Sequence, residues 1–170
     1  MDISENVMNH IEDAKDYLEL VDKLVTPQTA SLDKLVAVVL DEINQPDYMI
    51  DIDNIQAYYL KLSSELYLMV DKLKQFEIYS SLAKRSESES YNNAYLQESV
   101  AADKKPTVAE LQIKAEAKSK KEALVNTVYQ SAFKTMKSKV DAGSNLADSL
   151  KNILKLRANI EFAAGNLGNK

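Results

Sequence analysis

Residues that interrupt helices are scarce in this sequence of 170 residues, and their positions limit what the chain can form. It has three glycines, all after residue 142, and three prolines, Pro27, Pro46 and Pro106. Proline is tolerated at the start of a helix but breaks its interior. Low usage of both residues also disfavours a turn-rich β fold. The sequence therefore predicts an all-α protein whose helices are divided at the three prolines.

Four segments carry apolar residues at steps of three and four, which is the spacing of amphipathic helices. We expect a first helix over residues 3–25 and a second over 31–43 that is capped by Ser31. A third helix is expected to begin near residue 53. A fourth should begin after Thr107, whose hydroxyl forms a capping box with the Glu110 carboxylate. Gly143 marks either a kink in this last helix or a point of close packing.

These helices divide the chain into three parts. Residues 1–45 form acidic N-terminal helices, residues 46–165 form a long antiparallel helical hairpin, and residues 166–170 form a flexible tail. The arms of the hairpin are expected at 53–90 and 107–163, with a polar connection around 86–106. Helices longer than about 25 residues usually belong to coiled coils or assemblies, so we also expect an oligomer.

Charge is distributed unevenly along the chain. Residues 1–65 contain 14 acids and 4 bases, a balance of −10, whereas residues 104–170 contain 6 acids and 13 bases, a balance of +7. Such asymmetry is found in proteins with a nucleic-acid-binding half, and also where two halves attract each other within or between subunits. A solvated, lysine-rich helix face would give the same pattern.

The residues that most enzymes need are scarce. The chain has no cysteine and a single histidine, His10, and no glycine before residue 143 that could form a phosphate-binding loop. Asp47, Asp51 and Asp53 are clustered, but the glycine and the closing glutamate of a calcium-binding loop are missing. The sequence therefore predicts a protein that is not an enzyme, with no catalytic residue, no metal site and no cofactor.

The sequence also bears on location. No segment reaches the roughly 18–20 consecutive apolar residues of a membrane helix. The acidic N-terminal stretch lacks the basic-then-apolar order of a signal peptide, and the absence of cysteine suits a reducing compartment. We expect a cytoplasmic protein with no membrane partner.

A basic pair, Lys84-Arg85, lies in the stretch SSLAKRSESESYNNAY and has tyrosines on both sides. Cations beside aromatic rings are the combination that proteins use to hold phosphates and stack the bases of single strands, although Glu87 and Glu89 weaken the local field. The stretch KSKKE adds a second group of cations that could contact phosphates. The candidate DNA-binding residues are Lys84, Arg85, Tyr91, Lys118, Lys120 and Lys121.

The order of these features resembles that of the UvsY-type recombination mediator proteins of phages. The resemblance runs from about residue 31 to about residue 165. It covers SLDKLVAVVLDEI, MIDID, QAYYLKLSSELY with its paired aromatic residues, LAKRSESESY, TVAELQIKAEAKSKKEALVNTVYQSAFKTMKSK and LADSLKNILKLRANIEFAAG. It implies a ring-forming helical protein, not an enzyme, that binds single-stranded DNA. Such a protein helps to load a RecA-like recombinase onto DNA coated by a single-strand-binding protein, in a phage-infected bacterial host.

The resemblance also implies roles for two groups of residues. In the family, a Lys/Arg motif on the first arm of the hairpin, just before a tyrosine, is implicated in DNA binding. The nearest position in this chain is occupied by Lys84 and Arg85, and Tyr91 follows them. The family's C-terminal helix contributes to oligomerisation, and the corresponding stretch here has the spacing of a helix–helix seam. The residues of this candidate oligomer interface are Leu146, Leu150, Ile153, Leu154, Arg157 and Ile160.

Two functions follow from these observations. The first is a DNA-binding recombination accessory protein that acts as an oligomer. The second is a structural or adaptor protein, such as a virion component, an assembly chaperone or an inhibitor of a host system, which would act through protein contacts alone. Salt-dependent binding of single-stranded DNA would distinguish the first from the second.

Overall fold

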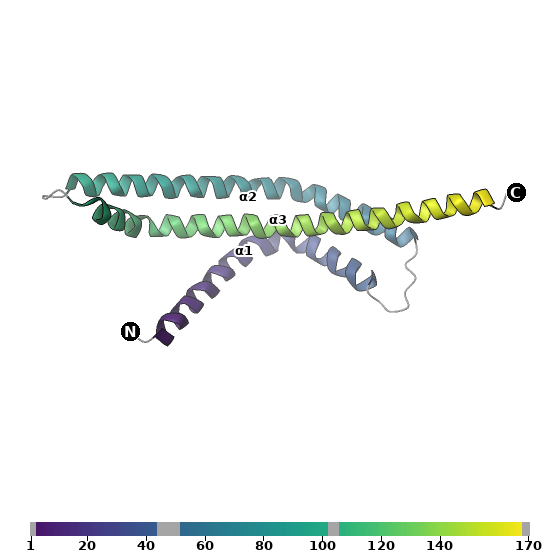
Figure 1. Ribbon diagram of the computed structural model, residues 1–170, viewed down its shortest axis with the longest axis horizontal. Coiled ribbons are helices and arrows are strands. Elements are labelled where there is room, and N and C mark those ends of the chain that lie inside the picture. The colour runs from purple at the N-terminus through teal and green to yellow at the C-terminus, as the bar shows by residue number, and fades with distance from the viewer. Residues whose placement is uncertain (1–2, 44–51, 102–105, 168–170) are drawn as a thin grey trace. The chain divides into compact units, whose positions relative to one another are not determined.

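The computed structural model describes residues 3–43, 52–101 and 106–167, with side-chain surroundings for 15–41, 43, 53–101 and 106–160. Three helices account for nearly all of these residues: α1 (Ile3–Ile43), α2 (Ile52–Ala101) and α3 (Val108–Leu167) (Figure 1). No strand occurs in the described ranges, so the predicted all-α class is confirmed for them. None of the three helices, over the residues described, is both long and apolar enough to cross a membrane.

The chain divides into two compact units, and each helix contributes a segment to both. The first unit contains Met1–Val25 and Leu73–Thr135, and the second contains Thr26–Lys72 and Met136–Lys170. The divisions fall inside helices, so neither unit is a continuous piece of the sequence. The units therefore differ from the predicted division at residues 45 and 165.

Large apolar side chains fill the core of the second unit. Buried residues of α2 recur at seven-residue intervals, the repeat that keeps one face of a helix against its neighbours. The side chains buried most completely in this unit are Leu32 and Val39 of α1, Leu62 and Met69 of α2, and Met136 and Leu150 of α3.

Gly143 is a point of close packing in this unit. A Cβ atom placed there would lie 3.1 Å from Leu66 Cδ2 and 3.3 Å from Leu32 Cδ1. α3 continues through this position as a helix to Leu167. Of the two interpretations of Gly143, the structure therefore confirms close contact between helices.

Polar contacts also join the helices of the second unit. The buried Thr29 hydroxyl donates to Asp33 Oδ2 at 2.8 Å, and Lys139 Nζ of α3 lies 2.5 Å from the same carboxylate oxygen. Lys72 Nζ of α2 donates to the Gln28 carbonyl at 3.0 Å. These contacts satisfy a buried hydroxyl and tie α1 to both other helices.

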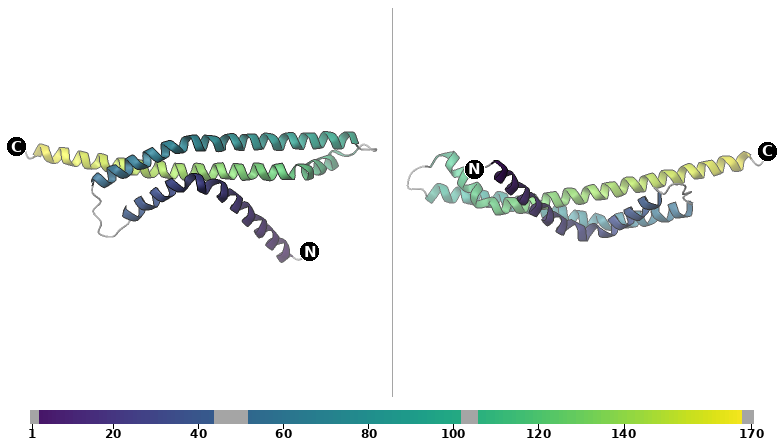
Figure 2. Two further views of the ribbon diagram at one scale, coloured as in Figure 1. Left: turned by 180° about the vertical axis from the view of Figure 1, so that it is seen from behind. Right: turned by 90° about the horizontal axis from the view of Figure 1, so that it is seen from below.

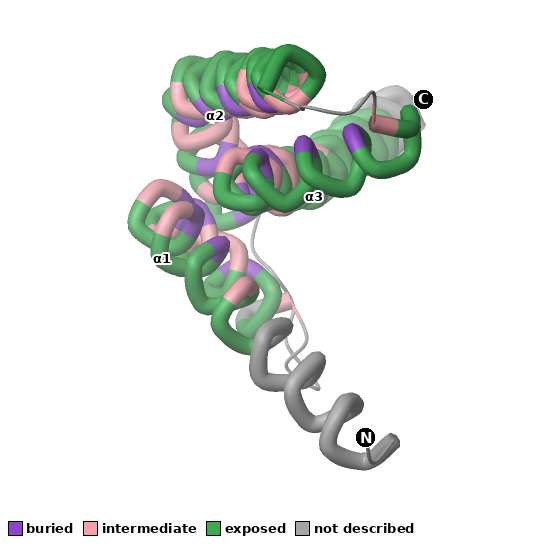
Figure 3. The backbone as a smooth tube through the Cα atoms, turned by 90° about the vertical axis from the view of Figure 1, so that its left-hand side faces the viewer, coloured by how far each residue is buried: buried purple, intermediate pink, exposed green. Residues whose placement is uncertain are grey.

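The core of the first unit contains more small and polar side chains than the core of the second. In it, α2 and α3 lie side by side (Figure 2). Tyr79 of α2 packs on Tyr129 of α3, with ring centroids 5.9 Å apart, and Glu98 of α2 pairs with Lys114 of α3. The buried residues lie on the sides that these helices turn toward each other (Figure 3). The buried residues of α2 and α3 in this unit include the small or polar Ala83, Ala94, Ala115, Ser119 and Asn126, beside the larger apolar Phe76 and Leu111.

Pro27 does not divide the N-terminal region into two helices, as the sequence had predicted. It lies inside α1, and Ser31 is therefore an internal residue of that helix rather than a cap. Proline removes one backbone hydrogen bond, to the carbonyl four residues earlier, at a cost of about 3 kcal/mol. The ring of Pro27 is exposed, while Val25 and Thr29 on either side are buried. Burial of the flanking residues outweighs the local cost.

The predicted polar connection around residues 86–106 is also wrong for most of its length, because α2 continues to Ala101. The serines, asparagines and glutamates of this stretch lie on a helix that buries Ala94 and pairs Glu98 with α3. At the other end of the chain, α3 extends into the predicted tail as far as Leu167, and residues 168–170 lie outside the described part.

The predicted capping box at the start of α3 is confirmed. The Thr107 backbone N–H donates to Glu110 Oε2 at 2.9 Å, and the Glu110 N–H donates to Thr107 Oγ1 at 3.3 Å. The Leu111 N–H donates to the Thr107 carbonyl at 3.1 Å. Two backbone donors that lack partners within the helix are thus satisfied by each other's side chains.

Thr107→Ala should lower the free energy of unfolding by about 1 kcal/mol, because the N–H of Glu110 loses its acceptor. Thr107→Ser keeps a hydroxyl at the same position and should retain most of the stability. Urea unfolding followed by circular dichroism measures both variants. Equal loss in the serine and alanine variants would show that the hydroxyl does not cap α3.

Candidate nucleic-acid interface

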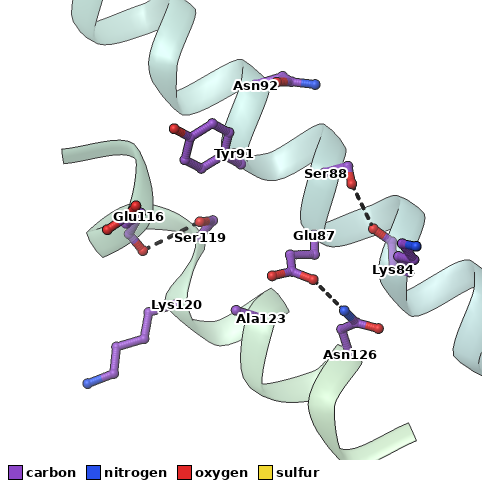
Figure 4. A pocket seen from close by; sticks show the side chains of 10 residues that line it. All are labelled: Lys84, Glu87, Ser88, Tyr91, Asn92, Glu116, Ser119, Lys120, Ala123 and Asn126. Atoms are coloured by element: carbon purple, nitrogen blue, oxygen red, sulfur yellow. Dashed lines mark hydrogen bonds between the residues drawn. The ribbon is translucent and has the colours of Figure 1, made fainter. Parts of the chain in front are cut away.

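A cleft lies between α2 and α3 in the first unit. Its volume is about 620 Å³. The α3 side is hollow because Ser119 and Ala123 are small, so their side chains do not fill the space opposite α2 (Figure 4). The residues that line it are Lys84, Glu87, Ser88, Tyr91 and Asn92 of α2, with Glu116, Ser119, Lys120, Ala123 and Asn126 of α3.

A polar contact crosses the seam at the floor of the cleft. Glu87 points from α2 toward α3, where Asn126 Nδ2 donates to its Oε2 (Figure 4). Asn126 is buried, and its Oδ1 accepts a hydrogen bond from Gln130 Nε2 at 3.1 Å. A buried polar residue in a helix seam specifies which positions face each other, at some cost in stability. Glu87 and Asn126 therefore set the register of α2 against α3 here.

Tyr91 supplies an aromatic surface to the cleft. Its ring stacks against that of Tyr95 one turn along α2, with centroids 6.4 Å apart and an interplanar angle of 28°. Both tyrosines are half-buried. Stacking on Tyr95 limits the orientations that the Tyr91 ring can take, so one edge of the cleft is ordered before any ligand arrives.

Two of the predicted DNA-binding lysines line this cleft from different helices. Lys84 lies on α2 and Lys120 on α3, and both are exposed. Neither has an ion-pair partner among the residues that the structure describes. Lys120 extends from α3 into solvent, away from α2 (Figure 4). Both ammonium groups are therefore free to contact a phosphate, although two cleft carboxylates, Glu87 and Glu116, balance their charge.

The remaining predicted cations lie elsewhere. Arg85 Nε is 2.7 Å from Glu89 Oε1, one turn along the same exposed helix face. The hydrogen bond that Arg85 donates to the Glu89 carboxylate raises the pKa of the guanidinium above its usual value. Lys118 and Lys121 line a different hollow, between α1 and α3. The structure thus brings Lys84, Tyr91 and Lys120 together at the cleft, while Arg85, Lys118 and Lys121 lie outside its lining. Lys120 stands between the two hollows and also lines the second one with Lys118 and Lys121.

A carboxylate holds two lysines beyond the cleft. Glu98 of α2 lies 2.6 Å from Lys118 Nζ and 3.0 Å from Lys114 Nζ through its two oxygens. Hydrogen bonds from Lys118 and then Lys114 hold the pKa of the Glu98 carboxyl below its ordinary value of 4.5. The ion pairs join α2 to α3 and partly neutralise Lys118, which reduces its attraction for phosphate.

The stabilising contribution of Glu98 should depend on pH. Because its pKa is lower in the folded chain, its contribution is complete well above 4.5 and is lost as pH falls through the folded-state pKa. Urea unfolding of the native chain and of Glu98→Gln should therefore differ near neutral pH and converge in acid, once the pH is below the folded-state pKa of Glu98. A difference that persists unchanged in acid would contradict the ion pairs.

The candidate oligomer-interface residues on α3 fall into two groups. Leu150 is buried within the second unit, and Leu146, Ile153 and Leu154 are half-buried there. These four already pack within their own chain. The residues left exposed are Arg157 and Ile160.

Metal-binding chemistry has little support in the described residues. Within 3–43, 52–101 and 106–167, no group of three or more histidines or carboxylates is placed to hold an ion. Asp47 and Asp51 lie outside the described residues, and so does the side chain of His10.

Sequence reasoning missed Asn126 and Ser119 as buried polar residues, and it treated Glu87 only as a neighbour that weakens the field. A signal for the first two existed in the sequence. Residues 119, 126, 133, 140, 147 and 154 of α3 follow a seven-residue repeat, in which Ser119 and Asn126 are the polar members before Phe133. Polar residues at the first two positions of an otherwise apolar seven-residue repeat predict that this part of the helix packs weakly, through a polar seam.

Comparisons with protein-family models, curated proteins and solved structures find no match to this chain.

Proposed function

We propose that the protein is a non-enzymatic accessory of phage recombination that binds single-stranded DNA. As a mediator, it would help to load a RecA-like recombinase onto DNA coated by a single-strand-binding protein. We further propose that its second and third helices form a long antiparallel hairpin, that the chain assembles into a homo-oligomer, and that it acts in the cytoplasm of the infected host.

The observation that carries this proposal is the meeting of Lys84, Tyr91 and Lys120 at one cleft. Lys84 and Lys120 come from different helices, and their ammonium groups can each contact a phosphate of a flexible strand. Tyr91 offers a ring on which a base can stack, an interaction worth about 1–3 kcal/mol per base in single-strand-binding proteins. A small number of contacts of this kind is enough for binding that tolerates any base sequence and weakens as the salt concentration rises.

A titration tests the proposal directly. Fluorescence anisotropy of a labelled oligothymidine should show binding at low salt, with an affinity that falls as salt rises. The variant Lys84→Ala/Lys120→Ala should bind more weakly, and its dependence of log affinity on log salt should be shallower by about 1.4, or about 0.7 for each lost phosphate contact.

A matched control removes the same charge from the same helices outside the cleft. Lys74 of α2 and Lys134 of α3 are exposed residues of the first unit and do not line the cleft. Lys74→Ala/Lys134→Ala should leave the salt dependence nearly unchanged. If both double variants lose affinity equally, the cleft is not the binding site, and if the native chain does not bind at low salt, the proposal fails.

Glu87→Gln should raise the affinity for single-stranded DNA several-fold. The glutamate places a negative charge in the cleft that repels phosphate, whereas glutamine keeps an oxygen to accept the hydrogen bond from Asn126. Glu77→Gln on the exposed side of α2 removes the same charge outside the cleft and should change the affinity less. Anisotropy titrations compare the two variants, and equal effects would mean that only net charge matters.

The recombination role requires a second measurement. Added to DNA coated by a single-strand-binding protein, the native chain should shorten the delay before a RecA-like recombinase assembles on that DNA. Lys84→Ala/Lys120→Ala should shorten it less. DNA binding without any effect on the delay would leave a DNA-binding protein that is not a mediator.

A structural or adaptor protein is the second candidate, and two observations favour it. Arg85 and Lys118 are already engaged by carboxylates, which reduces the charge available for DNA. In the second unit, Leu60 and Tyr67 of α2 are 56% and 78% exposed beside Leu68, an apolar surface suited to protein contact. Failure of the native chain to bind the oligonucleotide at low salt would favour this function.

A further inference from the structure

An apolar groove runs between α1 and α3 of the first unit, on a different side of α3 from most of the cleft residues. Its apolar lining comes from Leu20 and Leu24 of α1 and from Leu124, Val125 and Val128 of α3. The groove has a volume of about 280 Å³ and continues into a second hollow that shares Leu20 and Leu124. It therefore forms a continuous strip along both helices.

The strip is unusually exposed for its composition. Leu20 is 44% exposed, Leu124 is 51% exposed and Val125 is 41% exposed. Single exposed apolar residues are common on protein surfaces, but contiguous ones on adjacent helices mark interaction sites. Covering such a strip stabilises a complex by about 25 cal/mol for each Å² of apolar surface removed from water.

The two banks of the groove are held together before any partner binds. The Tyr17 hydroxyl of α1 donates to the Thr127 carbonyl of α3 at 3.0 Å and contacts the Ser131 hydroxyl. Because this contact fixes α1 against α3, a partner meets a preformed surface and loses less free energy to ordering it.

The charges beside the groove differ between its banks. Asp16 lies on the α1 bank, where Lys23 is already paired with Glu19 at 2.7 Å. Lys120 and Lys121 lie on the α3 bank. None of Asp16, Lys120 and Lys121 has an ion-pair partner within the described part of the chain. The surface is therefore an apolar strip with an acidic side and a basic side.

We infer that this groove is an interface for a second copy of the chain. A two-fold axis can place α1 of one copy opposite α3 of the other, which apposes the apolar strips and brings each Asp16 toward the partner copy's basic bank. Such an isologous contact uses the same patch on both copies. Pairing α1 with α1 would instead bring like charges together, so the charge pattern selects the first arrangement.

This interface is separate from the C-terminal residues of α3 that the sequence had named for oligomerisation. It uses α1 residues 16–24, which lie outside the stretch 31–165 that carries the family resemblance. It rests on the homo-oligomer of the proposed function, but it requires no DNA, so its failure is distinguishable from failure of the proposed DNA binding.

Light scattering coupled to size-exclusion chromatography tests the interface. At about 100 μM the native chain should form at least a dimer, and Leu124→Glu should raise the dissociation constant at least tenfold, because the interface would bury an unpaired carboxylate. Leu82→Glu places the same charge on α2 at a leucine of similar exposure, 56% against 51%, that lines neither the groove nor the cleft, and it should leave the mass unchanged. Circular dichroism verifies that each variant is folded.

A charge-reversal pair provides a second test that keeps the apolar strip intact. Asp16→Lys makes both banks basic, and Lys121→Asp lowers the charge of the basic bank. Each variant alone should associate more weakly than the native chain, and an equimolar mixture should form mixed dimers more readily than either variant self-associates. A monomeric native chain, an oligomer that Leu124→Glu leaves intact, or a mixture no stronger than its components would each overturn the inference.

Discussion

Leu62→Ala should lower the free energy of unfolding by about 2–5 kcal/mol, whereas Leu60→Ala should change it by less than about 0.5 kcal/mol. The two leucines lie two residues apart on α2. Leu62 is fully buried in the second unit, while Leu60 is 56% exposed. Removing the buried side chain loses its transfer free energy and leaves a cavity, and neither cost applies at the exposed position.

Equilibrium unfolding in urea, followed by circular dichroism, measures both variants. The comparison is sensitive because helix propensity and amino-acid change are the same at the two positions. Similar losses for Leu62→Ala and Leu60→Ala would contradict the side of α2 that the structure places against the core. They would also show that Leu60 is covered in solution, for example by another chain.

Gly143→Leu should lower the free energy of unfolding by about 1–3 kcal/mol, although leucine is a far better helix former than glycine. A single Cβ atom at this position already approaches Leu66 and Leu32 to 3.1 Å and 3.3 Å. The further atoms of leucine would have to displace these side chains in a packed core. Overpacking therefore outweighs the gain in helix propensity, which is about 1 kcal/mol.

Two neighbouring substitutions separate these effects. Ala142 is exposed, so Ala142→Leu should leave the stability almost unchanged. Gly143→Ala adds only the Cβ atom, and its gain in propensity should nearly cancel the close contact. Urea unfolding of the three variants gives the order of their free energies of unfolding. A Gly143→Leu variant more stable than the native chain would contradict close packing of α3 against Leu32 and Leu66.

Several elements of the fold were predictable because they depend on residues close in sequence. The capping box of Thr107 and Glu110 joins residues three apart, and its hydrogen bonds are those that the residue types predict. The helical character of the chain follows from few glycines and prolines and from apolar spacing. These features need no knowledge of which helices meet.

Neighbouring residues could not predict that α1 continues through Pro27 or that α2 continues through residues 86–101. A proline and a run of serine, asparagine and glutamate are unfavourable or neutral in an isolated helix. In the structure, Thr29 beside the proline is buried, while Glu87 and Glu98 of the polar run contact Asn126 and two lysines of α3. Contacts with distant residues decided where these helices continue.

At the candidate site, too, residue types were predictable from the sequence, whereas contacts between distant residues were not. The sequence identified basic residues and tyrosines that could bind DNA, but it did not tell which of them meet. Lys84 and Tyr91 share a cleft with Lys120, although 36 positions separate Lys84 from Lys120 in the chain. Arg85, which is adjacent to Lys84, points to Glu89 instead. One position along a helix turns a side chain by about 100°, so adjacent residues face different surroundings.

The sequence by itself determined the helical class, the cap of α3 and the uneven distribution of charge, because each depends on residue types or on spacings of three and four. Only the tertiary structure decided that α1 passes through Pro27, that Gly143 is a contact point, and which lysines remain free. It also decided that a cleft and an apolar groove lie on either side of α3. These properties arise where helices distant in sequence pack, and there the sizes of facing side chains determine which surface is filled and which stays open.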